Sequence, residues 1–154
     1  MIIWIFGRHS SGKTTLMNRI HNDLKKNNII SKCIDSDAIR SETHKHLGFS
    51  DIDRMNNNIG LLYKALESNK EIEVTLVTSI LPYNNIREKI LELSTSPLYF
   101  LYLTDGFDNN IKYPNNKFEE PTKGYYVAKY SQSTLNSEEY NNILEAIMQK
   151  VGGQ

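Results

Sequence analysis

The chain of 154 residues carries 18 basic and 18 acidic side chains, so its formal net charge at pH 7 is zero. This length suits one compact domain with a single core, and a hydrophobic fraction of 39% is ordinary for a globular protein. Because no basic excess is present, the composition excludes a general polyanion binder that holds nucleic acid by neutralising its phosphates. Any anion that this protein binds must be held by local geometry.

Cysteine content and apolar runs bear on metal chemistry and compartment. The single cysteine, Cys33, has no partner for an internal disulfide and cannot build a zinc site alone. The apolar start at residues 1–6 lacks a basic flank and is too short for a signal segment or a membrane span. We therefore expect a cytoplasmic protein with no membrane partner.

The first half of the chain alternates apolar runs with helical periodicity. Uninterrupted apolar runs are typical of strands in a parallel sheet that is covered on both faces. Ser50 is the predicted N-cap of a helix that begins at residue 51. The pattern predicts strands over 2–6, 29–34 and 73–78, and helices over 14–27, 37–46 and 51–69.

The second half continues the alternation and contains one long irregular segment. Residues 105–122 are rich in Asn, Pro, Gly and Lys without a sustained period, which predicts a loop. Strand and helix alternation predicts a single α/β domain over 1–154, with a parallel sheet of about five strands and helices on both faces. The further predicted elements are a helix over 86–93, strands over 98–103 and 125–129, and a terminal helix capped by Ser137.

Residues 7–14 carry the clearest chemical motif. They satisfy the pattern G-x-x-x-x-G-K-[ST], directly after a predicted strand and at the start of a predicted helix. The glycines let backbone N–H groups turn inward, Lys13 reaches the outer phosphates, and the Thr14 hydroxyl binds Mg²⁺. The pattern predicts a phosphate-binding loop. The residues expected to bind ATP are Gly7, Arg8, His9, Ser10, Ser11, Gly12, Lys13, Thr14 and Thr15.

Two carboxylates, Asp35 and Asp37, follow the second predicted strand. In a doubly wound sheet this carboxyl edge lies near the phosphate loop. A carboxylate there can hold Mg²⁺ and orient or deprotonate an acceptor hydroxyl, as phosphoryl transfer requires. The alternative is a pair of helix N-caps, and Asp37 can serve in both ways. No N-K-x-D guanine signature occurs, and the third strand ends without the acidic residue of a typical Walker B motif.

Several segments, in the same order, resemble the adenylylsulfate kinase family, whose members phosphorylate the 3′-hydroxyl of adenosine 5′-phosphosulfate with MgATP. The resemblance is strong over residues 1–90 and resumes weakly at 118–121. It implies a P-loop kinase fold and an ATP-dependent phosphotransferase that uses Mg²⁺ with ATP. The segments are Gly7–Thr15, Asp35–Arg40, Leu47–Arg54 with Asn57, and Ser79–Tyr83.

The resemblance also assigns roles to individual residues. It implies that Asp35 and Thr14 lie by the metal, with Asp35 and Lys13 as the catalytic pair. It implies that Phe49 and Phe118 enclose the acceptor base and that Arg54 holds an anionic group. Core packing for Phe49 and a solvated helix charge for Arg54 are the plain alternatives. The acceptor-binding residues so implied are Asp37, Arg40, Phe49, Arg54, Asn57, Ile80 and Phe118.

The chain departs from the family in the segment that forms its lid. The family's R-D-x-K-G-L-Y segment and basic lid are replaced by residues 104–110, and no arginine follows Arg87. A lid excludes water and supplies cationic groups to the transferring phosphoryl, so this loss bears on rate more than on binding. Arg8, or Lys112 and Lys117, are the candidates to replace it.

Two substitutions leave the acceptor open. Leu81 stands where the family has a serine, and Ile59 and Gly60 replace an arginine pair. The leading hypothesis is 3′-phosphorylation of adenosine 5′-phosphosulfate. The alternatives are a kinase for another activated nucleotide, such as a cytidine diphosphate derivative, and a nucleotide-binding protein without turnover. We expect ATP and a small nucleotide as partners, no nucleic acid, and leave a homodimer open.

Overall fold

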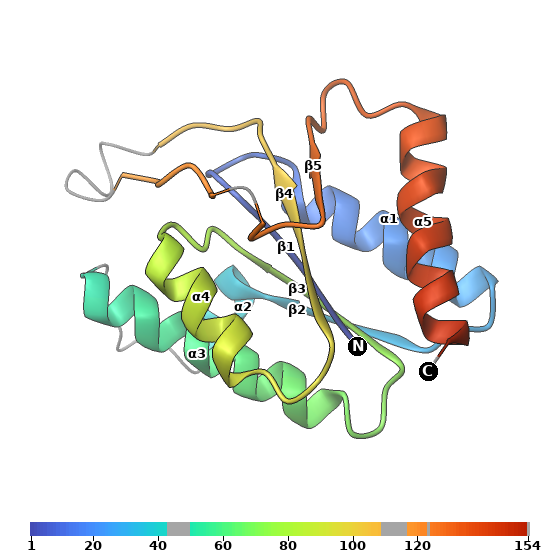
Figure 1. The fold of residues 1–154 in the computed structure, drawn as a ribbon, viewed down its shortest axis with the longest axis horizontal. Coiled ribbons are helices and arrows are strands. Elements are labelled where there is room, and N and C mark those ends of the chain that lie inside the picture. The colour runs from blue at the N-terminus through green and yellow to red at the C-terminus, as the bar shows by residue number, and fades with distance from the viewer. Residues whose placement is uncertain (43–49, 109–116, 123, 154) are drawn as a thin grey trace.

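Five parallel strands form one sheet in the computed structural model, which describes residues 1–42, 50–108, 117–122 and 124–153, with the backbone alone for 40–42. The strand order is β2-β3-β1-β4-β5, so β1 lies in the centre and the chain crosses over it between β3 and β4 (Figure 1). Both neighbours of β1 are parallel to it. The strands are β1 Ile2–Gly7, β2 Ser31–Asp35, β3 Val74–Ser79, β4 Leu98–Leu103 and β5 Ala128–Tyr130.

Helices cover both faces of this sheet, as the sequence predicts. Helices α1 and α5 lie on one side, and α3 and α4 lie on the other (Figure 1). Alternate residues of β1 serve the two sides: Ile3 and Ile5 pack with α1 and α5, whereas Trp4 and Phe6 pack with α3 and α4. The helices are α1 Lys13–Lys26, α2 Ser36–Glu42, α3 Asp51–Ser68, α4 Asn84–Leu93 and α5 Ser137–Gly152.

Several predicted boundaries are wrong by a few residues. The second strand begins at Ser31 rather than 29, because the Ile29 N–H donates to the Leu24 carbonyl and still belongs to the turn that ends α1. The last strand covers 128–130 instead of 125–129, and α4 begins at Asn84 rather than 86. Of the helix predicted over 37–46, the structure shows α2 over 36–42, and residues 43–46 lie outside the described part.

The two predicted N-caps have different outcomes. Ser50 is confirmed, because its side chain accepts from the Asp53 N–H at the start of α3. Ser137 is wrong: the cap of α5 is Asn136, whose Oδ1 accepts from the Glu139 N–H at 2.9 Å. Both residue types cap helices well, and the side chain three residues before Glu139 is the one in reach.

None of the described helices has both the length and the hydropathy of a membrane span.

Candidate active site at the phosphate loop

The phosphate loop joins β1 to α1 and is shaped by its glycines. Gly12 has φ of +92° and is the N-cap of α1, without any side chain capping the helix. The first N–H groups of α1 are therefore available to an anion. A Cβ on Gly7 would lie 2.5 Å from the Leu103 carbonyl oxygen, so only glycine fits there. His9, Ser10, Thr14 and Thr15 are exposed, whereas Ser11 is buried.

Lys13 folds back onto the phosphate loop. Its Nζ donates to the carbonyl oxygens of Arg8 at 2.8 Å and Gly7 at 3.3 Å. Burial lowers the pKa of Lys13 to about 8, and the carboxylates of Asp37 and Asp35 act in the opposite direction. The two carboxylates predicted for the acceptor side are thus close enough to act electrostatically on the cation of the phosphate side.

Nucleotide affinity is expected to depend on pH through Lys13. Only the protonated ammonium attracts phosphate, so the affinity for MgADP should be constant below a pH of about 8 and should fall towards tenfold per pH unit above it. Calorimetric titrations from about pH 7 to 9.5 test this, with Lys13→Met as the variant that lacks the titrating group. Undiminished wild-type affinity at the alkaline end would contradict it.

Asp35 ends β2 next to the phosphate loop. It lies opposite Thr78 in the register of β2 and β3, and the Thr78 hydroxyl donates to Asp35 Oδ1 at 2.9 Å. The Asp37 N–H also points to Asp35 Oδ1, at 3.4 Å, so the Asp35 carboxylate contacts the start of α2, as the N-cap alternative predicts. Thr78 is fully buried, which fixes the position of the carboxylate. The contact with the start of α2 leaves the predicted role of Asp35 beside the metal and the acceptor as a prediction.

The residues assigned to the acceptor side lie mainly on α2 and α3. Arg54 is only 8% exposed, so the reading as a solvated helix charge is wrong. Asn57 is also buried, and its Nδ2 donates to Ser36 Oγ at 3.1 Å, which ties α3 to the start of α2. Asp37 is exposed on α2. The side chain of Arg40, and Phe49 as a whole, lie outside the described residues.

The chain after β3 forms the next border of the site. Ile80 is half-buried, and Leu81 is buried with φ of +51°, an unusual conformation for a residue with a side chain. The Leu81 carbonyl accepts from Arg87 Nε at 3.0 Å. Where the family has a serine, this chain therefore has a buried leucine whose carbonyl accepts a hydrogen bond from the buried Arg87 guanidinium.

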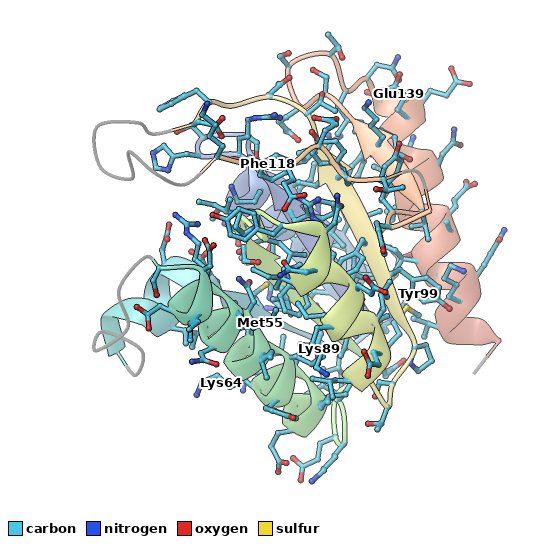
Figure 2. The ribbon with its side chains drawn as sticks, turned by 60° about the vertical axis from the view of Figure 1, so that its left-hand side comes forward. Met55, Lys64, Lys89, Tyr99, Phe118 and Glu139 are labelled. Atoms are coloured by element: carbon cyan, nitrogen blue, oxygen red, sulfur yellow. The ribbon has the colours of Figure 1, made fainter. Side chains whose placement is uncertain are left out.

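Phe118 lies in the core and is only 8% exposed. Figure 2 labels Phe118. Its ring packs beside those of Phe6 and Tyr102, with centroids 6.5 and 5.9 Å away. The guanidinium carbons of Arg8 and Arg87 lie 4.5 and 4.8 Å from its ring centroid. This packing leaves little of the ring for a ligand in the present state, and its role against an acceptor base stays a prediction.

The loop after β4 contacts the phosphate loop directly, which the sequence did not predict. The Phe107 N–H donates to the His9 carbonyl at 3.0 Å, and the two rings meet edge to face. On its other side Asp105 accepts from Ser131 Oγ at 2.7 Å and from the Ser133 N–H at 2.8 Å. Residues 105–107 therefore link the phosphate loop to the connection between β5 and α5.

Gly106 makes the contact between residues 105–107 and the phosphate loop sensitive to substitution. Its φ is +97°, and a Cβ there would collide with the His9 carbonyl oxygen. We expect Gly106→Ala to weaken MgADP binding by about tenfold, since the phosphate loop must shift. Gly124→Ala is the matched control, because φ is +112° there but a Cβ would meet no atom of the described residues within 4 Å, its two chain neighbours aside. Isothermal titration of both variants tests this, and equal affinities would contradict it.

The residues present suit a magnesium ion that is held largely by nucleotide phosphates. Among the described residues, no three His, Cys, Asp or Glu side chains gather into a metal site of their own. The Thr14 hydroxyl and the Asp35 carboxylate, the predicted ligands, carry the hard oxygen atoms that Mg²⁺ prefers. A site with few protein ligands is usual where the substrate itself brings the other oxygens.

The fold is that of a P-loop kinase. Its features are a parallel sheet in the order β2-β3-β1-β4-β5, the loop G-x-x-x-x-G-K-T after β1 and a carboxylate at the end of β2. The family model that matches is that of adenylylsulphate kinase, and it covers residues 1–110. The chain belongs to this family.

Curated relatives match a little over half of the chain. A probable adenylyl-sulfate kinase of Archaeoglobus fulgidus is 31% identical over 87 residues, which are 56% of this chain and 56% of the relative. The adenylyl-sulfate kinase of Rippkaea orientalis is 34% identical over 90 residues, which are 57% of this chain and 49% of the relative. The chain thus spans about half the length of the curated relatives it matches.

Solved structures share the fold over almost the whole chain. The Mycobacterium tuberculosis APS kinase in complex with AMPPNP and APS has a TM-score of 0.76 at 17% identity, covering 96% of both chains. A gluconokinase of Sinorhizobium meliloti has a TM-score of 0.64 at 15% identity, covering 98% of this chain and 93% of its own. At these identities the likeness concerns the fold alone.

Proposed function

We propose that the protein transfers the γ-phosphoryl group of MgATP to the 3′-hydroxyl of adenosine 5′-phosphosulfate. The observation that carries this proposal is the placement of Asp35 at the end of β2, where its carboxylate acts on the Lys13 ammonium. An acceptor-side base and a donor-side cation thus share one edge of the sheet. Membership of the adenylylsulphate kinase family supports this choice of acceptor.

The roles of the side chains follow from the chemistry of in-line transfer. The acceptor oxygen forms a bond to the γ-phosphorus while the bond from phosphorus to the bridging oxygen of ADP breaks. Asp35 orients the hydroxyl and accepts its proton, and Lys13 balances charge on the phosphoryl oxygens. When bound, Mg²⁺ neutralises further phosphate charge. Asp37, Arg54 and Asn57 hold the acceptor from α2 and α3.

An acceptor panel tests the proposal. Purified protein with MgATP is offered adenosine 5′-phosphosulfate, other activated nucleotides including cytidine diphosphate derivatives, and no acceptor, while ADP release is followed. We expect release with adenosine 5′-phosphosulfate alone. Release only with another nucleotide would move the proposal to that acceptor, and ATP binding without release would show a nucleotide-binding protein without turnover. The cytoplasmic location and a homodimer stay predictions.

A further inference from the structure

Arg8 of the phosphate loop directs its charged group toward the described parts of the long connection between β4 and β5. Its Nε lies 3.6 Å from Asp108 Oδ1 and its Nη2 lies 3.6 Å from Glu120 Oε2. Its Nη1 donates to the Tyr102 hydroxyl at 3.3 Å, and the same hydroxyl lies 3.0 Å from Glu120. The Arg8 guanidinium therefore pairs with two carboxylates of this connection, Asp108 in its first described part and Glu120 in its second.

Residues 118–120 of the same connection also contact Arg87. This guanidinium donates from Nη2 to the Glu119 carbonyl at 2.8 Å and from Nε to the Leu81 carbonyl. Residues 118–120 thus contact two arginines, Arg8 of the phosphate loop and Arg87 of α4. The ring of Phe118 lies against both guanidinium groups.

We propose that Arg8 is a positioning residue for the acceptor: it fixes residues 118–120 relative to the phosphate loop and does not act on the transferred phosphoryl group. Two carboxylates and an aromatic ring engage its guanidinium, so the charge is satisfied away from the phosphates. This inference rests on the proposed function, because it treats residues 118–120 as a border of the acceptor site.

Charge distribution explains why an arginine is suited to this position. Glu120 also pairs with Lys129, whose Nζ lies 3.8 Å from Oε1, so one carboxylate joins the phosphate loop to β5. Only a planar fork can contact Asp108, Glu120 and Tyr102 together while resting on a ring. We therefore expect Arg8→Lys to retain part of the positioning effect on residues 118–120 and Arg8→Met to lose it.

The kinetic test separates positioning from phosphate stabilisation. With Arg8→Met we expect the KM for the acceptor nucleotide to rise about tenfold, with kcat and the Kd for MgATP changed less than about threefold. Glu120→Gln should act in the same direction, and the double variant should be no worse than Arg8→Met, since both break one network. A fall in kcat with unchanged acceptor KM, without any effect of Glu120→Gln, would overturn the proposal.

A second readout needs no turnover and therefore stands apart from the acceptor panel. Trypsin cleavage after the exposed Lys117 should be at least several-fold faster in Arg8→Met and in Glu120→Gln than in the wild type. Arg19→Met is the matched control, because Arg19 lies over the Tyr140 ring on α5 and not at this site. Unchanged cleavage in both test variants would overturn the proposal even if the protein phosphorylates adenosine 5′-phosphosulfate.

Discussion

Replacing Asp35 by asparagine is expected to lower kcat for phosphoryl transfer by about 10²–10⁴-fold, the usual contribution of a positioned general base. The asparagine side chain keeps an oxygen that can accept from the Thr78 hydroxyl and the Asp37 N–H, so the start of α2 should survive. What is lost is the negative charge that receives the acceptor proton. Because Lys13 and the loop amides remain, the Kd for ATP measured without Mg²⁺ should change less than about threefold.

Steady-state kinetics and equilibrium titration of Asp35→Asn give the two quantities separately. Glu67→Gln is the matched control, because Glu67 is an exposed carboxylate on α3 that pairs with Lys70. It should leave kcat unchanged. An Asp35→Asn variant that turns over at the wild-type rate would remove Asp35 from the mechanism, whatever the substrate.

Replacing Arg87 by methionine is expected to lower the free energy of unfolding by about 2–4 kcal/mol, because it leaves buried acceptors without their donors. Arg87 is fully buried, and it donates to the carbonyl oxygens of Leu81 and Glu119 and to Asn84 Oδ1. Burial lowers its pKa to about 10, so it stays charged at neutral pH. Its loss also removes the contact that holds Leu81 at positive φ.

Urea unfolding followed by circular dichroism measures this loss. Lys89→Met on the same helix (Figure 2) is the control. The Lys89 side chain is about half exposed, and its Nζ lies 3.7 Å from Glu92 Oε1. A surface pair of this kind contributes about 0–1 kcal/mol. A midpoint for Arg87→Met equal to that of Lys89→Met would show that the buried guanidinium is dispensable for folding.

The order of strands and helices and the phosphate loop were predictable because they rest on local patterns. Apolar runs at β1, β3 and β4 and the spacing of Gly7, Gly12 and Lys13 are properties of neighbouring residues. The proximity of Asp35 to Lys13 also follows from the sequence, since the carboxyl ends of parallel strands meet at one edge. The cap of α5 was missed by one residue because Asn136 and Ser137 are both good capping residues.

The contacts around the long connection could not be predicted in this way. Arg87 occupies a helix position that gives no sign of burial in the sequence, and only the packing of α4 against residues 118–120 places it inside. The contact of Phe107 with His9 depends on a turn at Gly106 that no periodic pattern indicates. Arg8 was a candidate for phosphate contact, whereas the structure pairs its guanidinium with Asp108 and Glu120.

The central claim is that the phosphoryl group goes to the 3′-hydroxyl of adenosine 5′-phosphosulfate, and the product itself tests it most directly. Phosphorus NMR of the mixture after incubation with MgATP should show one new phosphate monoester whose resonance is split by the single proton on the 3′ carbon. A spectrum in which adenosine 5′-phosphosulfate stays unmodified, while titration shows that the protein binds MgATP, would contradict the claim.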